Sequence, residues 1–276
     1  MAQPLRSGLR GAFGLSLALA AAVPAHATSF SFDFVNQSYT NSATNKQTFN
    51  ATGGTGSTPL FTRTVSGQSV QLQMSAYFID TSTAQNKTYN AQLNFYSGGI
   101  GITDANESST SPNHAIDNNN GVDFLVLQFS KAVNLSSINI GWIYNDSDAT
   151  IRYGNAPGAW NVLPAINNVA YGAAGGLGSM LNPSVIAANG GTATGSRATP
   201  NGGFSDFWII SAANPNPIEG SRSKADYFKV ASIVVSDFPP LPEPGTWMTM
   251  IFGFGAIAAM MRRRHARPVS ADGLAA

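Results

Sequence analysis

The sequence lacks cysteine and is poor in charge. Its 276 residues include no Cys, which excludes disulfides, thiolate metal sites and a cysteine nucleophile. Only 11% of the residues are charged, too few for the lysine- and glutamate-rich surfaces of a helical bundle. Glycine and asparagine, which tolerate the positive φ angles of tight turns, are abundant. The composition favours strands joined by many turns, and an all-β domain often exceeds about 200 residues.

Basic residues are scarce in the middle of the chain. Of the 15 Lys and Arg, two lie before residue 11 and four lie in 262–267. Nine basic residues remain in the middle against twelve acidic ones, because Glu243 and Asp272 lie outside it, so its net charge is near −3. A nucleic-acid-binding domain carries a basic face. The sequence therefore predicts no nucleic-acid partner.

The first 27 residues have the pattern of a secretory signal peptide. Arg6 and Arg10 form a basic start, 12–23 is apolar, and Ala25-His26-Ala27 places small residues where signal peptidase requires them. The pattern predicts cleavage between Ala27 and Thr28, with signal peptidase as a processing partner.

The C-terminal end combines three features. Pro242-Glu243-Pro244 closes a proline-rich stretch that cannot continue a helix or a central strand. An apolar run at 246–261 follows, opened by Trp247, and the basic cluster 262–267 comes directly after it, starting with Arg262, Arg263 and Arg264. Trp at one edge and Arg at the other predict a minimal transmembrane helix with its basic end in the cytoplasm. An ordinary tail anchor is the alternative interpretation.

This pattern, at 239–267 with a tail at 268–276, resembles the PEP-CTERM sorting signal of Gram-negative bacteria. The resemblance implies recognition and cleavage by an exosortase. It implies that the precursor is held at the inner membrane and that the processed protein reaches the cell surface or the extracellular matrix. Association with exopolysaccharide, within a biofilm, also follows from the resemblance.

Between the two ends, short segments alternate between apolar and polar residues. Such alternation is typical of half-buried strands, and turn-forming clusters separate the segments. We expect one antiparallel β-sandwich at 28–238. The small polar residues of 171–203 predict a long loop. The alternating or apolar segments are 29–35, 70–78, 91–96, 122–129, 133–144, 149–153, 207–211 and 227–236.

Part of this region is similar to exosortase-dependent surface proteins. The similarity rests on 97–103, Glu107, 111–118, 123–129, 141–142, 146–148 and 226–230. It implies a β-rich, jelly-roll-like ectodomain and supplies no known reaction.

Oxygen-bearing side chains gather between residues 104 and 123. Calcium binds carboxylate, amide and carbonyl oxygens. Glu107, Asp117 and Asp123 are therefore the predicted ligands of one structural calcium. The alternative is that these side chains cap turns.

No catalytic motif stands out. The domain contains one histidine, His114, and no G-x-S-x-G elbow. The sequence predicts an exported, non-enzymatic surface protein. Two alternatives stay open: a carbohydrate-binding module with an aromatic face, and a secreted hydrolase using His114 with Asp117 or Asp123. The aromatic candidates are Tyr144, Tyr153, Trp160 and Trp208.

Overall fold

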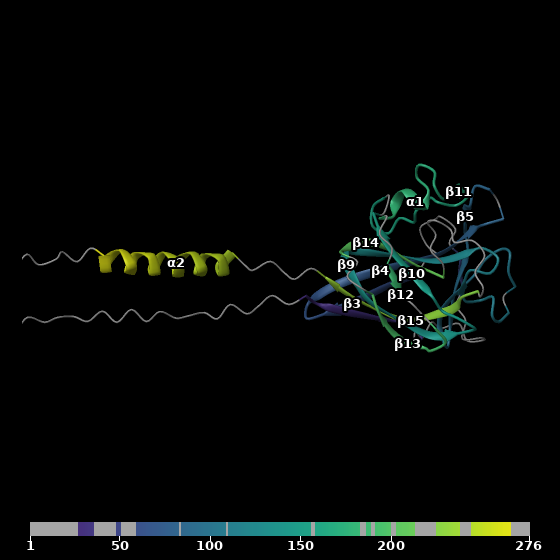
Figure 1. The fold of residues 1–276 in the computed structure, drawn as a ribbon, viewed down its shortest axis with the longest axis horizontal. Coiled ribbons are helices and arrows are strands. Elements are labelled where there is room, and N and C mark those ends of the chain that lie inside the picture. Colours follow the sequence, from purple (N-terminus) through teal and green to yellow (C-terminus); the bar gives the residue numbers. More distant parts are fainter. Residues whose placement is uncertain are drawn as a thin grey trace, which may run out of the picture. The chain divides into compact units, whose positions relative to one another are not determined.

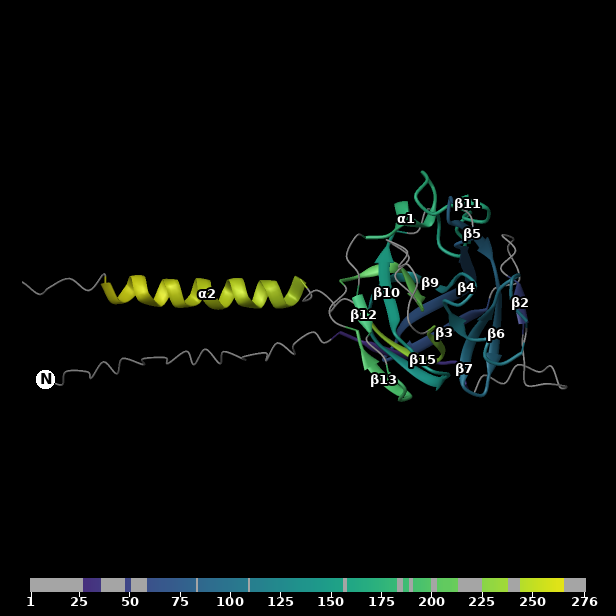
Figure 2. The same cartoon turned by 45° about the vertical axis from the view of Figure 1, so that its right-hand side comes forward.

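The computed structural model of the chain describes 27–35, 48–50, 59–82, 84–108, 110–155, 158–182, 186–188, 191–199, 203–212, 225–237 and 244–265. The described residues belong to two compact units (Figures 1 and 2). One spans Ala27–Pro239 and is called the β domain below. The other joins the two ends of the chain, and its described part is a single helix.

The β domain is built mostly of strands, and every strand pairing in it is antiparallel. The strands form one curled sheet. Its described elements are β1 Ser29–Asp33, β2 Thr48–Asn50, β3 Leu60–Val65, β4 Gln68–Asp80, β5 Lys87–Asn90, β6 Gln92–Tyr96, β7 Gly99–Thr103, β8 Ile116–Asp117, β9 Val122–Ile143, β10 Ala149–Gly154, β11 Val169–Ala170, α1 Leu177–Met180, β12 Ile186–Ala188, β13 Gly195–Ala198, β14 Ser205–Ser211 and β15 Tyr227–Asp237.

Strand β9 organises the sheet. Its 22 residues pair with β4 and β14 over the first part and with β13 and β15 over the second. The main strand order is β11-β5-β4-β9-β15-β7-β6-β2. Strand β1 adds to β15 in full register, from Ser29 opposite Ser236 to Asp33 opposite Ser232. This pairing brings the start and the end of the β domain side by side.

Two apolar clusters cover opposite faces of the central strands. Along β4, Ala76 and Phe78 belong to the main core, whereas Tyr77 and Ile79 belong to a second cluster. Strands β9 and β14 divide their buried side chains in the same way. The second face is covered by the chain around α1, which contributes Leu177. Because both faces are covered, these strands contain long apolar runs rather than strict alternation.

The structure differs from the predicted long loop at 171–203. The described part of that segment contains α1, β12 and β13. Strand β13 pairs with the second part of β9, and β12 pairs with β10. These short strands are held by main-chain hydrogen bonds and contain few large apolar residues, so the period-two signal is missing from the sequence. The two segments predicted at 122–129 and 133–144 are joined in the single strand β9.

The C-terminal prediction of a helix agrees with α2, which runs from Pro244 to His265. No helix of the described residues is long and apolar enough to cross a membrane, contrary to the transmembrane assignment of 246–261. The predicted signal peptide up to residue 26, Pro242, Glu243 and the tail lie outside the described residues.

Candidate cation site

Three acidic side chains meet at one end of the sheet. Glu107 lies in the turn that follows β7, Asp117 ends β8, and Asp123 is the second residue of β9. The pairing of β8 with β15 places Asp117 opposite Tyr227, and the pairing of β4 with β9 places Asp123 opposite Phe78. One carboxylate oxygen from each acid lies within 4.8 Å of the other two. The predicted ligand set is therefore brought together by the fold.

These carboxylates are buried and largely unpaired. Asp117 and Asp123 are each 2% exposed. Both oxygens of Asp123, both of Glu107 and Oδ2 of Asp117 have no hydrogen-bond partner among the described residues. The remaining oxygen, Oδ1 of Asp117, accepts a hydrogen bond from the main-chain amide of Asn119 at 2.9 Å. Burying an ionised carboxylate without a donor or a cation is costly, so this site requires a cation or bound protons.

The electrostatics of the site also indicate that it needs a cation or bound protons. Burial, followed by the charges of Asp117 and Asp104, raises the pKa of Glu107 to about 9. Burial is also the main cause that raises the pKa of Asp117 to about 7 and the pKa of Asp123 well above its ordinary value. Glu107 and Asp117 could hydrogen-bond each other only if one of the two kept a proton. A bound cation would replace such protons and remove the mutual repulsion of the three acids.

A fourth acid, Asp104, extends the negative charge. It directly follows β7 and is 6% exposed. Its Oδ1 accepts a hydrogen bond from the main-chain amide of Asn106 at 2.6 Å. This bond fixes the turn that carries Glu107. The charge of Asp104 contributes to the raised pKa of Glu107, Asp117 and Asp123 alike. Asp104 belongs to the same acid-rich stretch of the chain, and nothing in the sequence alone separates its role from that of its neighbours.

The donor set fits calcium. Carboxylate oxygens are the ligands of hard cations, and oxygens on opposite sides of a calcium ion lie up to about 5 Å apart because each Ca–O distance is about 2.3–2.6 Å. The spacing within 4.8 Å agrees with that geometry. Magnesium usually keeps several bound waters. Two of the three acids are almost fully buried, which leaves little room for such a water shell.

A second acidic group, formed by Asp146, Asp148 and Asp226, differs in its surroundings. One carboxylate oxygen of each lies within 4.8 Å of the others. Both oxygens of Asp226 accept hydrogen bonds, from the Asp148 amide at 3.1 Å and from Asn118 Nδ2 at 2.9 Å. The nearby guanidinium of Arg197 interacts with Asp146 and Asp148. This group already has donors and a positive charge, so its need for a metal is weaker.

The aromatic candidates separate into core and surface. Trp208 is fully buried and belongs to the main core, which excludes it from a binding face. Tyr144 is 48% exposed, and its ring lies 6.5 Å from that of Trp142, with an angle of 11° between the planes. Trp142 alternates with Ile138 and Ile140 along β9, and this pattern alone predicts a core position. Its side chain is instead half-buried.

The residues of the predicted processing signals are only partly described. Pro244 and Trp247 lie in the first turn of α2, while Arg262, Arg263 and Arg264 lie in its last turn. Arg262 is exposed. At the other end, Ala27 is exposed, and Thr28 contacts Asp237 through its main-chain amide.

Comparisons with protein families, with curated proteins and with solved structures find no match to this chain. The site must therefore be interpreted from its own geometry.

Proposed function

We propose that the chain is an exported, non-enzymatic surface or extracellular-matrix protein whose β domain is a jelly-roll-like sandwich stabilised by one calcium ion. The proposed calcium site rests on one observation, the cluster formed by the carboxylates of Glu107, Asp117 and Asp123. Of these, Asp123 is 2% exposed, and neither of its oxygens has a partner among the described residues. Extracellular modules bind calcium with dissociation constants of about 10⁻⁴–10⁻³ M, a range that suits an exported domain.

Thermal unfolding of the full chain in calcium and in chelator tests this proposal. Calcium at about 100 times its dissociation constant should stabilise the folded state by about 2.7 kcal/mol. For a chain of this size that corresponds to a rise in Tm of about 5–10 °C. An unchanged Tm would overturn the calcium assignment.

Substitution of one ligand separates metal binding from simple packing. In Asp123→Asn, the increase in Tm with calcium should disappear, while the Tm in chelator should be retained or rise because one buried charge is removed. Asp206→Asn is the matched control, since Asp206 is exposed on β14 and lies outside the cluster. It should keep the full calcium effect.

We further propose that the C-terminal segment is a sorting signal cut by an exosortase near Pro242-Glu243-Pro244. The sequence of α2, an apolar run followed by a basic end, supports membrane association before processing. The α2 side chains Ile251, Phe252 and Phe254 are each at least 67% exposed within their own unit, and the basic cluster begins at Arg262. Exposed apolar surface of this kind marks a membrane or protein contact.

Two epitope tags test the sorting proposal. One is placed after Thr28 and the other after Arg267, and both are followed in a host that has an exosortase. Separation of the tags is expected, and Glu243→Gln should slow it. If both tags remain on a single full-length membrane species, the segment is a permanent anchor.

A carbohydrate-binding module is the second candidate. The parallel rings of half-buried Trp142 and exposed Tyr144 favour it, because flat aromatic surfaces stack on sugar rings. A glycan array probed with the wild type and with Tyr144→Ala would decide between the two. Binding that is lost in the variant supports the module, and absence of binding supports a purely structural domain.

A further inference from the structure

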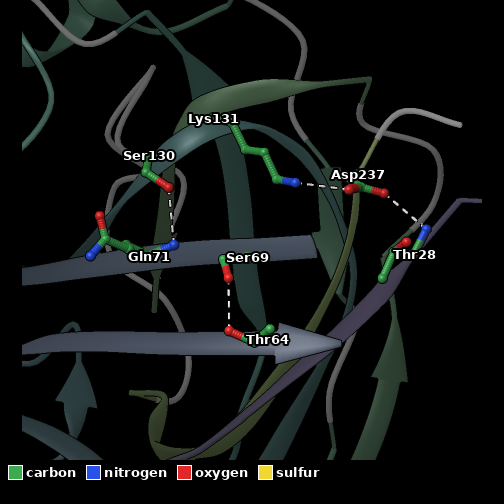
Figure 3. A network of polar contacts seen from close by, with 7 residues as sticks. All are labelled: Thr28, Thr64, Ser69, Gln71, Ser130, Lys131 and Asp237. Atoms are coloured by element: carbon green, nitrogen blue, oxygen red, sulfur yellow. Dashed lines mark hydrogen bonds and ion pairs between the residues drawn. The ribbon is translucent and has the colours of Figure 1, made fainter. Parts of the chain in front are cut away.

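The amide of Thr28 lies against a carboxylate from the far end of the β domain. It donates a hydrogen bond to Oδ1 of Asp237 at 2.8 Å (Figure 3). The main-chain amide of Asp237 donates in turn to the Thr28 carbonyl at 3.1 Å. The other carboxylate oxygen of Asp237 forms an ion pair with Nζ of Lys131 at 2.8 Å. Asp237 therefore lies between Lys131 and the main-chain nitrogen of Thr28.

The surrounding structure fixes this arrangement. Asp237 is 7% exposed and is the last residue of β15, and β1 pairs with β15 from Ser29 onward. The side chain of Lys131 leaves β9 and passes over the ring of Phe30, with Nζ 5.3 Å from the ring centroid. Phe30 is fully buried. The carboxylate is thus held in place by three strands before any change at Thr28.

Thr28 is also the residue that signal peptidase would leave at the start of the mature chain. The bond that would be cut is the peptide bond between Ala27 and Thr28, by hydrolysis with one water molecule. The cut converts the neutral amide nitrogen of Thr28 into a primary amine. An α-amino group has an ordinary pKa of about 7.7–8.0 and is mostly protonated at neutral pH. The nitrogen that contacts Asp237 would then carry a positive charge.

We propose that Asp237 is the binding site for the α-ammonium group that cleavage creates at Thr28, so that processing itself strengthens the closure of β1 onto β15. This inference rests on the proposed export and cleavage. The existing hydrogen bond joins a neutral N–H to a carboxylate that is already paired with Lys131. With a charged donor it would become a second ion pair, for which N⁺–H···O⁻ distances of about 2.7–2.9 Å are typical. Capture of a terminal amine by a preformed acceptor is an established mode of recognition.

The charged groups around Thr28 determine the direction of the effect. Asp237 on β15 attracts the new ammonium group, and Lys131 on β9 opposes it from the other oxygen. Arg63 on β3 donates a hydrogen bond to the Ser31 carbonyl, two residues beyond the first strand residue. Attraction should prevail because Thr28 contacts the carboxylate directly, whereas both cations bind other oxygen atoms.

The test compares two forms of the chain from Thr28 to Ala276. One has a free amine at Thr28, and the other is N-acetylated there. Acetylation keeps an N–H donor for Asp237 and removes only the charge. The free-amine form should have a Tm about 2–4 °C higher at pH 6. This difference should vanish at pH 10, where the amine is neutral.

Asp237→Asn provides the second arm, because it keeps an oxygen acceptor and loses the negative charge. In that variant the two forms should have equal Tm values at pH 6. Asp33→Asn is the matched control: it removes the same charge from the other end of β1 and should leave the difference intact. Equal Tm values for the two wild-type forms at pH 6, or the same difference in Asp237→Asn, would overturn the proposal.

The cleavage site is tested separately, by N-terminal sequencing of the exported protein. A start other than Thr28 would contradict the predicted signal-peptide cleavage, whereas the acetylation experiment would still report whether Asp237 binds the amine.

Discussion

Asn118 and Asp226 hold each other through two reciprocal hydrogen bonds across 108 residues of sequence. Nδ2 of Asn118 donates to Oδ2 of Asp226 at 2.9 Å, and the Asp226 amide donates to Oδ1 of Asn118 at 2.9 Å. Asn118 directly follows the predicted ligand Asp117, and Asp226 directly precedes β15. The pair therefore connects the cation site to the second acidic group.

Replacing Asn118 with Ala should destabilise the domain. The change removes a donor and an acceptor from the buried Asp226, and the expected loss is about 1–3 kcal/mol in the free energy of unfolding. Urea unfolding measures it. Asn119→Ala is the matched control, because the neighbouring residue is exposed and contributes only its main-chain amide to Asp117. Equal losses in the two variants would contradict the importance of the pair.

Without calcium, the stability of the protein should fall as the pH rises from about 5 to 9. Glu107 and Asp117 have folded-state pKa values of about 9 and about 7, above the ordinary values near 4 that hold in the unfolded chain. A raised folded-state pKa gives stability that is complete below the unfolded pKa and is lost as the pH rises through the folded one. The Tm in chelator should therefore decrease across this range, and the increase caused by calcium should be larger at pH 8 than at pH 5. A calcium effect of equal size at both pH values would argue against these groups.

Asp104 should tune calcium affinity in two separable ways. Asp104→Asn keeps an acceptor for the Asn106 amide and loses the charge, whereas Asp104→Ala loses both. Residues that orient metal ligands typically contribute 10–100-fold to affinity. We expect about tenfold weaker calcium binding in Asp104→Asn and a larger loss in Asp104→Ala, measured by isothermal titration calorimetry. If the two variants bind equally, the turn at Asn106 plays no part in positioning Glu107.

Gly101 allows a close approach of β7 to the chain that precedes β8. A Cβ atom at Gly101 would lie 1.9 Å from the His114 carbonyl oxygen, so Gly101→Ala requires main-chain movement. Overpacking of this kind typically costs about 1–3 kcal/mol. The control is Gly172→Ala, where no atom lies within 4 Å of the added Cβ. Thermal unfolding should show a clear loss in the first variant and little change in the second.

The sequence predicted strands that carry large apolar residues on one face or on both, and it missed short strands that contain few of them. In β1, Phe30 and Phe32 are buried between exposed serines, and this alternation can be identified in the sequence alone. Apart from Ile186, strands β12 and β13 consist of small or polar residues, and their pairing depends on neighbours far away in the chain. The sandwich assignment remains a proposal, because one curled sheet connects all of the strands described.

The candidate site likewise contains residues that the sequence alone could predict and others that only the fold brings together. Glu107, Asp117 and Asp123 lie within one acid-rich stretch of the chain, so local density was enough to nominate them. Asp226 lies about a hundred residues later and is brought to Asn118 only by the pairing of β15 with β8. The contact between Asp237 and Thr28 could not be predicted from the sequence either, since it depends on the register of β1 against β15.

Lys229 provides the last prediction, because it is a buried cation between aromatic rings. Its Nζ lies 4.3 Å from the ring centroid of Tyr96 and 4.2 Å from that of Trp142. The residue is 4% exposed, and among the described residues no carboxylate forms an ion pair with it. Burial lowers the pKa of Lys229 to about 8, below its ordinary value near 10.4.

The sign of the resulting pH dependence follows from proton binding. Between pH 8 and pH 10 the unfolded chain keeps a proton on Lys229 that the folded chain has lost. The contribution of Lys229 to the free energy of unfolding therefore rises with pH. Relative to Lys229→Met, which keeps the apolar stem and never carries a charge, the wild type should gain stability from pH 7 to pH 9.5. Urea unfolding of both proteins in saturating calcium measures the difference, and calcium suppresses titration of the acidic cluster. A difference that stays constant or shrinks would mean that the rings of Tyr96 and Trp142 keep the ammonium group charged throughout, through cation–π attraction stronger than the cost of burial.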